Sequence, residues 1–357
     1  QEEDAEYANK KGFSKHKPAL PLYSVRDAVN AVKQLEPIDD NTWAEPASQL
    51  RFRFRTAGHI IGSGMIEAEI LEEEKPLRCL FSGDVGRYDA PLVPDPHEPD
   101  PCDVLVVEST YGDRTHPEVS IQDQLKECLE SIVERNGQML VPAFAVGRSQ
   151  QLVVLLDEVM KANPKLAVPI HLDSPMAVDT TKIYGKYAEE SGLEEVDLRS
   201  GRSPIYGDNV YLHKKRDESM RLNDLRGPRV IISSSGMMTG GRVLHHLKRL
   251  VTDSRNLIVL AGYQAPGTRG WRLQRGEETV RIHGRDIDVG ARLSKISGLS
   301  AHADSDQLVR WLKDLPAPKR TFIVHGDDGA PQALAKRFEK ELGHHCETPE
   351  LGDSYAL

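Results

Sequence analysis

The stretch QMLVPAFAVGRSQQLVVLLDEVM, residues 138–160, decides the fold class of this sequence. Its first four residues have the apolar texture of a short strand, and a turn with one glycine follows. From about Ser149, four apolar residues recur at the spacing of a helix that buries one face: Leu152, Val153, Leu156 and Met160. Strand, turn and helix in this order predict one βα unit of a sheet whose strands are parallel.

Further βα units lie on both sides of this stretch. Ser120 is placed to cap a preceding helix, and Gly137 is placed to end it. Strands are expected at 168–172, 230–233 and 257–261. One helix is expected after the first of these strands, running through Tyr184, and another from about Arg242. The alternation predicts an α/β fold in which helices cover a mainly parallel sheet.

Short strands dominate outside this α/β unit. Residues 51–107 and the segment after about Arg275 have strand texture. A helix, a strand and a last helix are expected at 306–315, 320–324 and 332–342. The simplest partition inserts an α/β unit, residues 116–275, into a β-rich domain built from residues 1–115 and 276–357.

Composition excludes several classes of protein. The chain has 357 residues, of which 39% are hydrophobic, and a net charge of −9. It suits a globular protein with a full core, and it is unlike a disordered chain, a membrane span or a wholly basic nucleic-acid binder. The N-terminus has no apolar signal segment and resembles a polar helix or arm. Four scattered cysteines without a CxxC motif favour reduced thiols in a cytoplasmic protein.

Four loops follow the strands of the α/β unit directly. They are PAFAVGRSQ (142–150), DSPMA (173–177), SSSGMMTGGR (233–242) and GYQAPGT (262–268). In a parallel sheet these loops meet at the carboxyl edge, and their backbone N–H groups at helix starts suit phosphate. Arg148 and Arg242 add positive charge. Ordinary turns are the alternative, because glycine-rich turns before helices are common.

A second group of polar residues lies in the β-rich parts. Its members are of the types that ligate zinc or move protons: His59, Asp84, Glu108, His302 and His325. Each taken alone also fits an ordinary turn or cap residue. The adjacent pairs 245–246 and 344–345 cannot face one metal from a helix, and we expect them on the surface.

Taken in order, the motifs resemble a known family. They are TAGHIIGSG, FSGDVGR, ESTYGD, FAVGRSQ, DSPMA, SSSGMMTGGR, GYQAPGT, SAHAD and VHGD. From about Pro21 onward the chain resembles the β-CASP branch of the metallo-β-lactamase fold. It is most similar to bacterial RNA-cleaving members, related to the nuclease subunit of the eukaryotic pre-mRNA 3′-end cleavage complex. The resemblance implies an αββα lactamase body with an inserted β-CASP α/β domain.

The resemblance also implies a role for each residue of the second group. His59 and His325 correspond to ligands of two different zinc ions, and Asp84 to the aspartate that bridges them. Glu108 corresponds to a supporting carboxylate, which would fix the tautomer of a neighbouring histidine. His302 corresponds to the general acid for the leaving oxygen. A histidine at position 325 is typical of the RNA-cleaving relatives, since DNA-processing ones carry an aliphatic residue there.

The implied activity is zinc-dependent hydrolysis of RNA phosphodiester bonds by an endonuclease. A 5′-exonuclease activity is a further option. The partner would be single-stranded RNA, with no membrane involved, and a homodimer is left open. The expected RNA-binding residues lie in the carboxyl-edge loops: Arg148, Ser174, Ser235, Gly236 and Arg242. Two alternatives remain, namely a non-catalytic RNA-binding or assembly paralogue, and a hydrolase of thioesters or lactams.

One motif of the family is absent from these residues. The metal-binding HxHxDH sequence does not occur, and no HxH is found in the 357 residues. We expect it upstream of the first residue, so that the polypeptide as given holds only half of its metal site. A natural pseudo-enzyme is the alternative.

Overall fold

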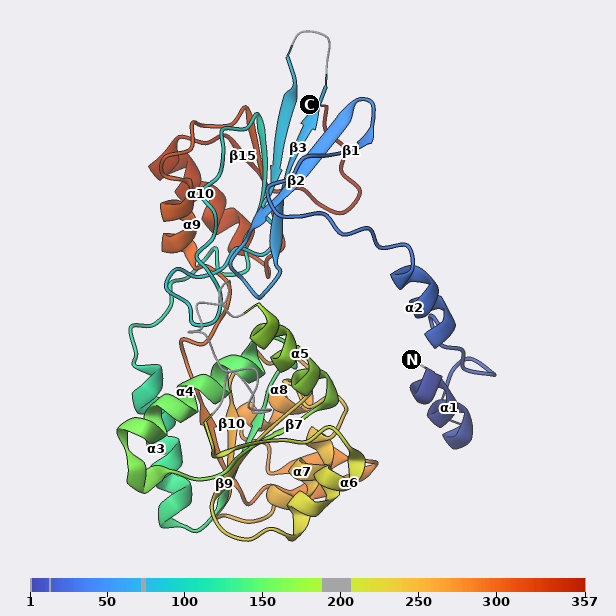
Figure 1. Cartoon of the computed structure of the whole chain (residues 1–357), viewed down its shortest axis with the longest axis vertical. Coiled ribbons are helices and arrows are strands. Elements are labelled where there is room, and N and C mark those ends of the chain that lie inside the picture. The colour runs from blue at the N-terminus through green and yellow to red at the C-terminus, as the bar shows by residue number, and fades with distance from the viewer. Residues whose placement is uncertain (1, 13, 72–74, 188–206, 357) are drawn as a thin grey trace.

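The computed structural model describes residues 2–12, 14–71, 75–187 and 207–356, and these form two lobes stacked along the long axis of the molecule (Figure 1). Each lobe is built on its own sheet. The first sheet has seven strands in the order β1-β2-β3-β4-β5-β14-β15, and the second has six in the order β13-β10-β6-β9-β7-β8.

The seven-stranded sheet is antiparallel at one side and parallel at the other. Its strands are β1 (Ala44–Ala47), β2 (Leu50–Thr56), β3 (Gly64–Ile70), β4 (Leu77–Phe81), β5 (Val104–Glu108), β14 (Arg320–Val324) and β15 (Cys346–Glu347). Strands β4, β5, β14 and β15 run parallel to one another, whereas β1 to β4 pair antiparallel. Helices α9 (Ser305–Leu312) and α10 (Ala330–Leu342) cover one face, where Trp311 and Phe338 pack on Leu80, Leu105 and Ile323.

The six-stranded sheet is wholly parallel in its recorded pairings, as the βα alternation predicts. Its strands are β6 (Gln138–Pro142), β7 (Ile170–Asp173), β8 (Val210–Leu212), β9 (Arg229–Ser233), β10 (Leu257–Leu260) and β13 (Arg292–Lys295). Its main helices are α3 (Ile121–Glu134), α4 (Arg148–Ala162), α5 (Pro175–Lys186), α6 (Arg216–Arg221), α7 (Val243–Leu250) and α8 (Arg269–Gln274), with 3₁₀ turns at Pro164–Leu166 and Leu222–Asp224.

Local sequence explains where these helices begin. Ser120 caps α3 by accepting a hydrogen bond from the Asp123 N–H, and Ser174 caps α5 in the same way with Pro175 in its first turn. Apolar residues of α3, α4 and α5 form one core on one face of the sheet. Residues of α7 and α8 form a second core on the opposite face, so the lobe has three layers.

The boundary of the α/β lobe differs from the sequence partition. Strand β13 pairs with β10, with Lys295 opposite Leu260. The hairpin of β11 (Thr279–Ile282) and β12 (Arg285–Asp288) buries Val280 and Ile282 in the core under α7. Residues 279–295, which the partition assigned to the β-rich domain, therefore lie with the α/β lobe, because strand texture does not reveal the pairing partner.

Two helices precede the sheets, α1 (Glu2–Lys11) and α2 (Val25–Val32), and they stand apart from both lobes (Figure 1). Ser24 and Asp27 form a reciprocal cap at the start of α2. None of the residues of α2 is buried. No helix in the described ranges is long and apolar enough to cross a membrane.

Candidate metal centre

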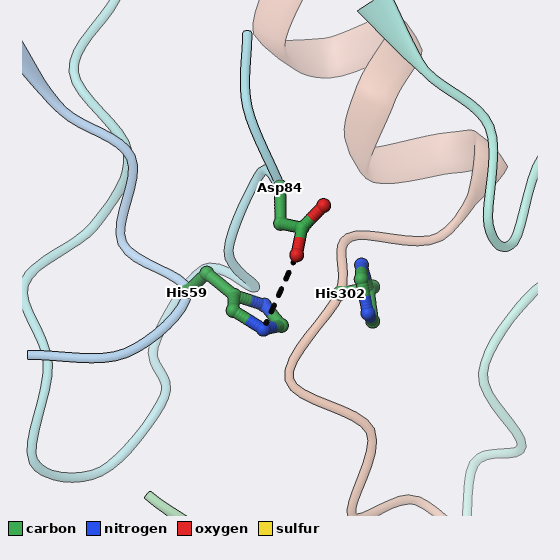
Figure 2. Close-up of side chains that lie close together, drawn as sticks. All are labelled: His59, Asp84 and His302. Carbon is green, nitrogen blue, oxygen red and sulfur yellow. Dashed lines mark ion pairs between the residues drawn. The ribbon is translucent and has the colours of Figure 1, made fainter. Parts of the chain in front are cut away.

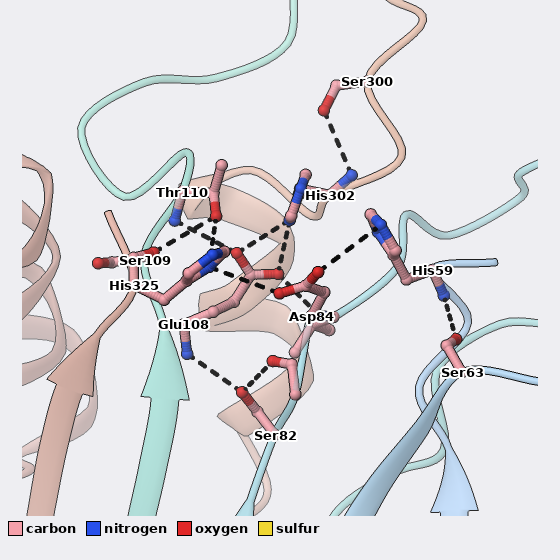
Figure 3. Close-up of polar contacts among 12 residues, drawn as sticks. His59, Ser63, Ser82, Asp84, Glu108, Ser109, Thr110, Ser300, His302 and His325 are labelled. Atoms are coloured by element: carbon pink, nitrogen blue, oxygen red, sulfur yellow. Dashed lines mark hydrogen bonds and ion pairs between the residues drawn. The ribbon is translucent and has the colours of Figure 1, made fainter. Parts of the chain in front are cut away.

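The five polar residues of the second group converge at the carboxyl end of the seven-stranded sheet (Figure 3). Strands β4, β5 and β14 are parallel neighbours, so the residues that end or follow them meet at one edge. Asp84 follows β4, Glu108 ends β5 and His325 follows β14. His59 lies in the turn after β2, and His302 pairs with Gly86 in a short bridge ahead of α9.

Close backbone packing fixes the His59 turn against the Asp84 turn. The Gly86 N–H donates to the Ala57 carbonyl at 2.7 Å. A Cβ atom at Gly86 would lie 1.9 Å from the Gly58 carbonyl oxygen and 2.6 Å from the His59 nitrogen. Only glycine allows this approach, and it brings the side chains of His59 and Asp84 to the same point.

Asp84 lies between two imidazoles. Its Oδ2 is 3.8 Å from His59 Nε2, and its Oδ1 is 3.5 Å from His325 Nδ1 (Figures 2 and 3). These separations are long for hydrogen bonds. Two ligands at about 2.0–2.1 Å from a tetrahedral zinc ion are about 3.3 Å apart, so the spacing suits atoms that share an ion. The residues present therefore fit zinc.

The histidines are in a state that suits metal binding. Burial and the neighbouring His302 lower the pKa of His59, which keeps its ring neutral. His59 Nδ1 is buried and has no hydrogen-bond partner in the described structure. His325 adopts a left-handed backbone with a φ of 52°, and its carbonyl accepts from the Ser109 N–H. Such backbone conformations are uncommon outside glycine and concentrate at functional sites.

Glu108 is hydrogen-bonded to His302. Its carboxylate oxygens lie 3.0 and 3.1 Å from His302 Nδ1, and they also accept from the N–H groups of Val85 and Thr110. A carboxylate accepts only, so Nδ1 of His302 carries the proton, and Nε2 is the atom left for chemistry. Figure 2 shows the His302 ring beside His59 and Asp84, and the ring centroids of the two histidines are 4.4 Å apart.

Glu108 and His302 also shift each other's pKa. Burial disfavours ionisation of Glu108, but hydrogen bonds from His302 and the backbone hold the pKa of its carboxyl below the ordinary value. Burial likewise opposes protonation of His302, yet the hydrogen bond and charge of Glu108 raise the pKa of its imidazole. A histidine with a raised pKa next to candidate metal ligands is suited to give a proton to a leaving group.

The expected RNA-binding arginines are occupied by protein acceptors. Arg148 donates to the Ala261 carbonyl, and burial lowers the pKa of its guanidinium to about 10. Arg242 donates to Asp173 Oδ1 at 2.7 Å and to the carbonyls of His213 and Lys214. Both groups brace the carboxyl-edge loops, and their contact with phosphate stays a prediction.

The remaining loop residues also make contacts within the protein at this edge. Ser174 caps α5, and the hydroxyl of Ser235 accepts from the Thr239 N–H. Gly236 lies against Phe144, where a Cβ atom would be 3.3 Å from the Phe144 nitrogen. The structure places these loops beside one another, because β6, β7 and β9 are neighbours in the sheet. Their role in RNA binding is likewise a prediction.

Two histidines expected on the surface are buried. His246 lies on the inner face of α7, and its Nε2 is 2.6 Å from Asp173 Oδ2. His344 is also buried, with its ring 6.0 Å from that of Phe338. These expectations were wrong, whereas His245 and His345 are exposed. His246 shares a helix face with Val243 and Leu250, so its spacing could have indicated burial.

Together these features fit a metal-dependent hydrolase centre with a carboxylate-oriented histidine, on a two-lobed α/β chain. Residues 149–273 match the Beta-Casp domain family. Residues 286–349 match the family described as the Zn-dependent metallo-hydrolase RNA specificity domain. This match and the donor set agree on a zinc cofactor.

The chain is similar to several characterised proteins. Ribonuclease TTHA0252 of Thermus thermophilus is 33% identical over 318 residues, which cover 88% of this chain and 72% of that protein. The RNase J-like protein of Methanocaldococcus jannaschii is 31% identical over 324 residues, covering 90% and 74%. The transcription termination factor FttA of Pyrococcus horikoshii is 30% identical over 349 residues, covering 94% and 53%. The chain belongs to the β-CASP family of metallo-β-lactamase-fold ribonucleases.

Proposed function

We propose that this protein is a zinc-dependent ribonuclease that hydrolyses RNA phosphodiester bonds in RNA processing or decay. One observation carries the proposal. Asp84 lies between His59 and His325, and the third histidine beside it, His302, is oriented by a buried carboxylate. Membership of the ribonuclease family and the match to an RNA specificity domain support the same conclusion.

Each side chain has a defined task in this reaction. His59, Asp84 and His325 hold the metal, which when bound activates water and stabilises negative charge on the phosphoryl group. His302 gives the proton at its Nε2 to the leaving oxygen. Glu108 keeps the other ring nitrogen protonated and the ring in place, since its own oxygens are 3.0 and 3.1 Å from His302 Nδ1.

The proposal extends to two zinc ions. Asp84 turns one oxygen to each histidine, so with His59 on one side and His325 on the other it would help to hold both ions. The RNA would be single-stranded, with its phosphates on the backbone donors of residues 174–177 and 235–241 and with Arg148 and Arg242 in support. We further propose endonucleolytic cleavage with a 5′-exonuclease activity, and a reducing cytoplasm suits the four free cysteines.

Substitution of His302 tests this assignment. In the full-length protein, His302→Ala should keep the zinc content of the wild type and lose about 10²–10⁴-fold in RNA cleavage, because a general acid contributes that factor. His345→Ala is the matched control, since His345 is exposed and lies away from the centre. Cleavage is measured on an end-labelled RNA, and zinc by atomic emission.

Two results would contradict the proposal. Loss of zinc together with cleavage in His302→Ala would make His302 a ligand rather than an acid. RNA binding without any cleavage by the zinc-loaded wild type would favour the non-catalytic RNA-binding paralogue.

A further inference from the structure

Three large apolar side chains are exposed at the carboxyl edge of the second sheet. Phe144 follows β6 and is 50% exposed, and Tyr263 follows β10 and is 56% exposed. Met176, in the first turn of α5 after β7, is 65% exposed. Strands β10, β6, β9 and β7 are consecutive neighbours, so the three strands that these residues follow span about 14 Å at ordinary strand spacing.

This row lies beside the metal centre. Gly147, three residues after Phe144, is so close to the first lobe that a Cβ atom there would be 3.0 Å from Ile60 Cγ2. Ile60 is the neighbour of His59 in the chain. The hydroxyl of Tyr184, in α5, is hydrogen-bonded to the backbone of Ile61. The loop that carries Phe144 therefore contacts the turn that carries a proposed metal ligand.

The two rings stand on a rigid base and have space beside them. Gln264 donates to the carbonyls of Gly236 and Gly262, which ties the Tyr263 loop to the loop after β9. A Cβ atom at Gly236 would be 3.5 Å from Phe144 Cδ2, so this glycine supports the edge of the ring. A Cβ atom at Gly262 would meet no atom within 4 Å.

One exposed cation also lies at this edge, and its charge suits a polyanion. Lys295 ends β13 opposite Leu260, three residues before Tyr263, and it is exposed. Exposed rings together with positive charge are the usual parts of a surface for single-stranded nucleic acid. The Phe144 loop also exposes Val146, but the loop contacts the turn of the candidate metal centre through Gly147 and Ile60, and this favours the RNA substrate over a protein partner.

We propose that Phe144 and Tyr263, with Met176 at the end of the row, form a stacking surface for unpaired bases of the RNA substrate. The inference rests on the proposed function, and it adds a physical basis for the selection of single-stranded RNA. Every base has a π-face, so stacking tolerates any sequence. Bases of a duplex keep their faces covered, so this surface selects single-stranded RNA.

Binding to two matched oligomers tests the proposal. One probe is a fluorescent ten-residue oligouridine, and the other is an abasic oligomer with the same number of phosphates, both in a chelator that prevents cleavage. Phe144→Leu and Tyr263→Leu should each weaken oligouridine binding about 5- to 100-fold, because a stacked base contributes about 1–3 kcal/mol and 1.4 kcal/mol is tenfold. Binding of the abasic oligomer should not change.

Two further variants separate stacking from damage to the loop. Tyr263→Trp keeps a ring, so it should retain oligouridine affinity, and its added tryptophan fluorescence should fall on binding. Tyr23→Leu is the control, because Tyr23 has the same 56% exposure but precedes α2, away from both lobes.

The outcomes are distinct for the two proposals. Equal oligouridine affinity in the wild type and both leucine variants would overturn the stacking surface and leave the ribonuclease proposal standing. Equal weakening for both oligomers would also overturn stacking, because the effect would then come from the backbone. A wild type that neither binds nor cleaves RNA would remove the proposed function itself.

Discussion

Arg242 offers a quantitative test of how the carboxyl-edge loops are held. Its guanidinium is 2.7 Å from Asp173 Oδ1, and the Asp173 side chain is fully buried. Asp173 also accepts from Ser219 and lies 2.6 Å from His246 Nε2. Arg242→Ala therefore leaves a buried carboxylate with fewer partners, although two of its hydrogen bonds remain.

The expected cost follows from this geometry. Removing one partner of a buried ion pair costs about 3–5 kcal/mol when the remaining charge is unpaired. Because Asp173 keeps Ser219 and His246, we expect Arg242→Ala to lower the free energy of unfolding by about 2–3 kcal/mol. Lys248→Ala, at an exposed position on the same helix, should change it by less than about 0.5 kcal/mol.

Urea denaturation followed by circular dichroism measures both variants, and RNA affinity is measured beside it. The result that would refute the reasoning is an unfolding free energy for Arg242→Ala equal to that of Lys248→Ala, because the guanidinium would then contribute nothing to holding the loop. Lower RNA affinity of Arg242→Ala is expected in either case, since the proposed function gives Arg242 a supporting part in phosphate binding.

Two further predictions concern acid stability and the packing of the centre. Burial and the nearby His213 lower the pKa of His171 to about 4, so between pH 6.5 and 4 the unfolded chain takes up a proton that the folded protein does not. Stability should fall by about 1–2 kcal/mol more in the wild type than in His171→Phe between pH 7 and pH 5, measured by urea denaturation; equal losses would count against the burial of this ring. Gly86→Ala should weaken zinc binding about tenfold or more, measured by competition with a chromophoric chelator, because its Cβ would lie 1.9 Å from the Gly58 oxygen and displace His59. Gly262→Ala, with no atom within 4 Å, is the control, and equal zinc affinities would refute this account of the turn.

Much of the architecture could be read from local sequence. The strand expected at Arg320–Val324 forms β14 over the same residues, because a continuous apolar run between turns leaves few alternatives. The Ser120 cap and the inward residues of α3 follow from helix periodicity in the same way. The pairing of β13 with β10 could not be read, since it depends on chain far away in sequence.

The residues of the candidate metal centre could be predicted from the sequence, but the hydrogen bonds of the carboxyl-edge loops could not. His59, Asp84 and His325 come together because each follows a strand at one edge of the same sheet. The roles of Arg148 and Arg242 depend on their acceptors, Ala261 and Asp173, which are distant in sequence and make no local pattern. A charged residue in a glycine-rich loop therefore suggests a ligand site from sequence alone, although in the structure its side chain holds the loop in place.

Zinc binding by Asp84→Ala tests the central claim most directly. Zinc affinity is measured by chelator competition on the full-length protein, with RNA cleavage on the same samples and Asp314→Ala as a control whose side chain is 82% exposed. The geometry predicts that Asp84→Ala loses at least about 100-fold in zinc affinity and loses cleavage, because each of its two oxygens faces a histidine proposed as a zinc ligand. Asp314→Ala should behave as the wild type. Unchanged zinc affinity and cleavage in Asp84→Ala would contradict the assignment of this centre.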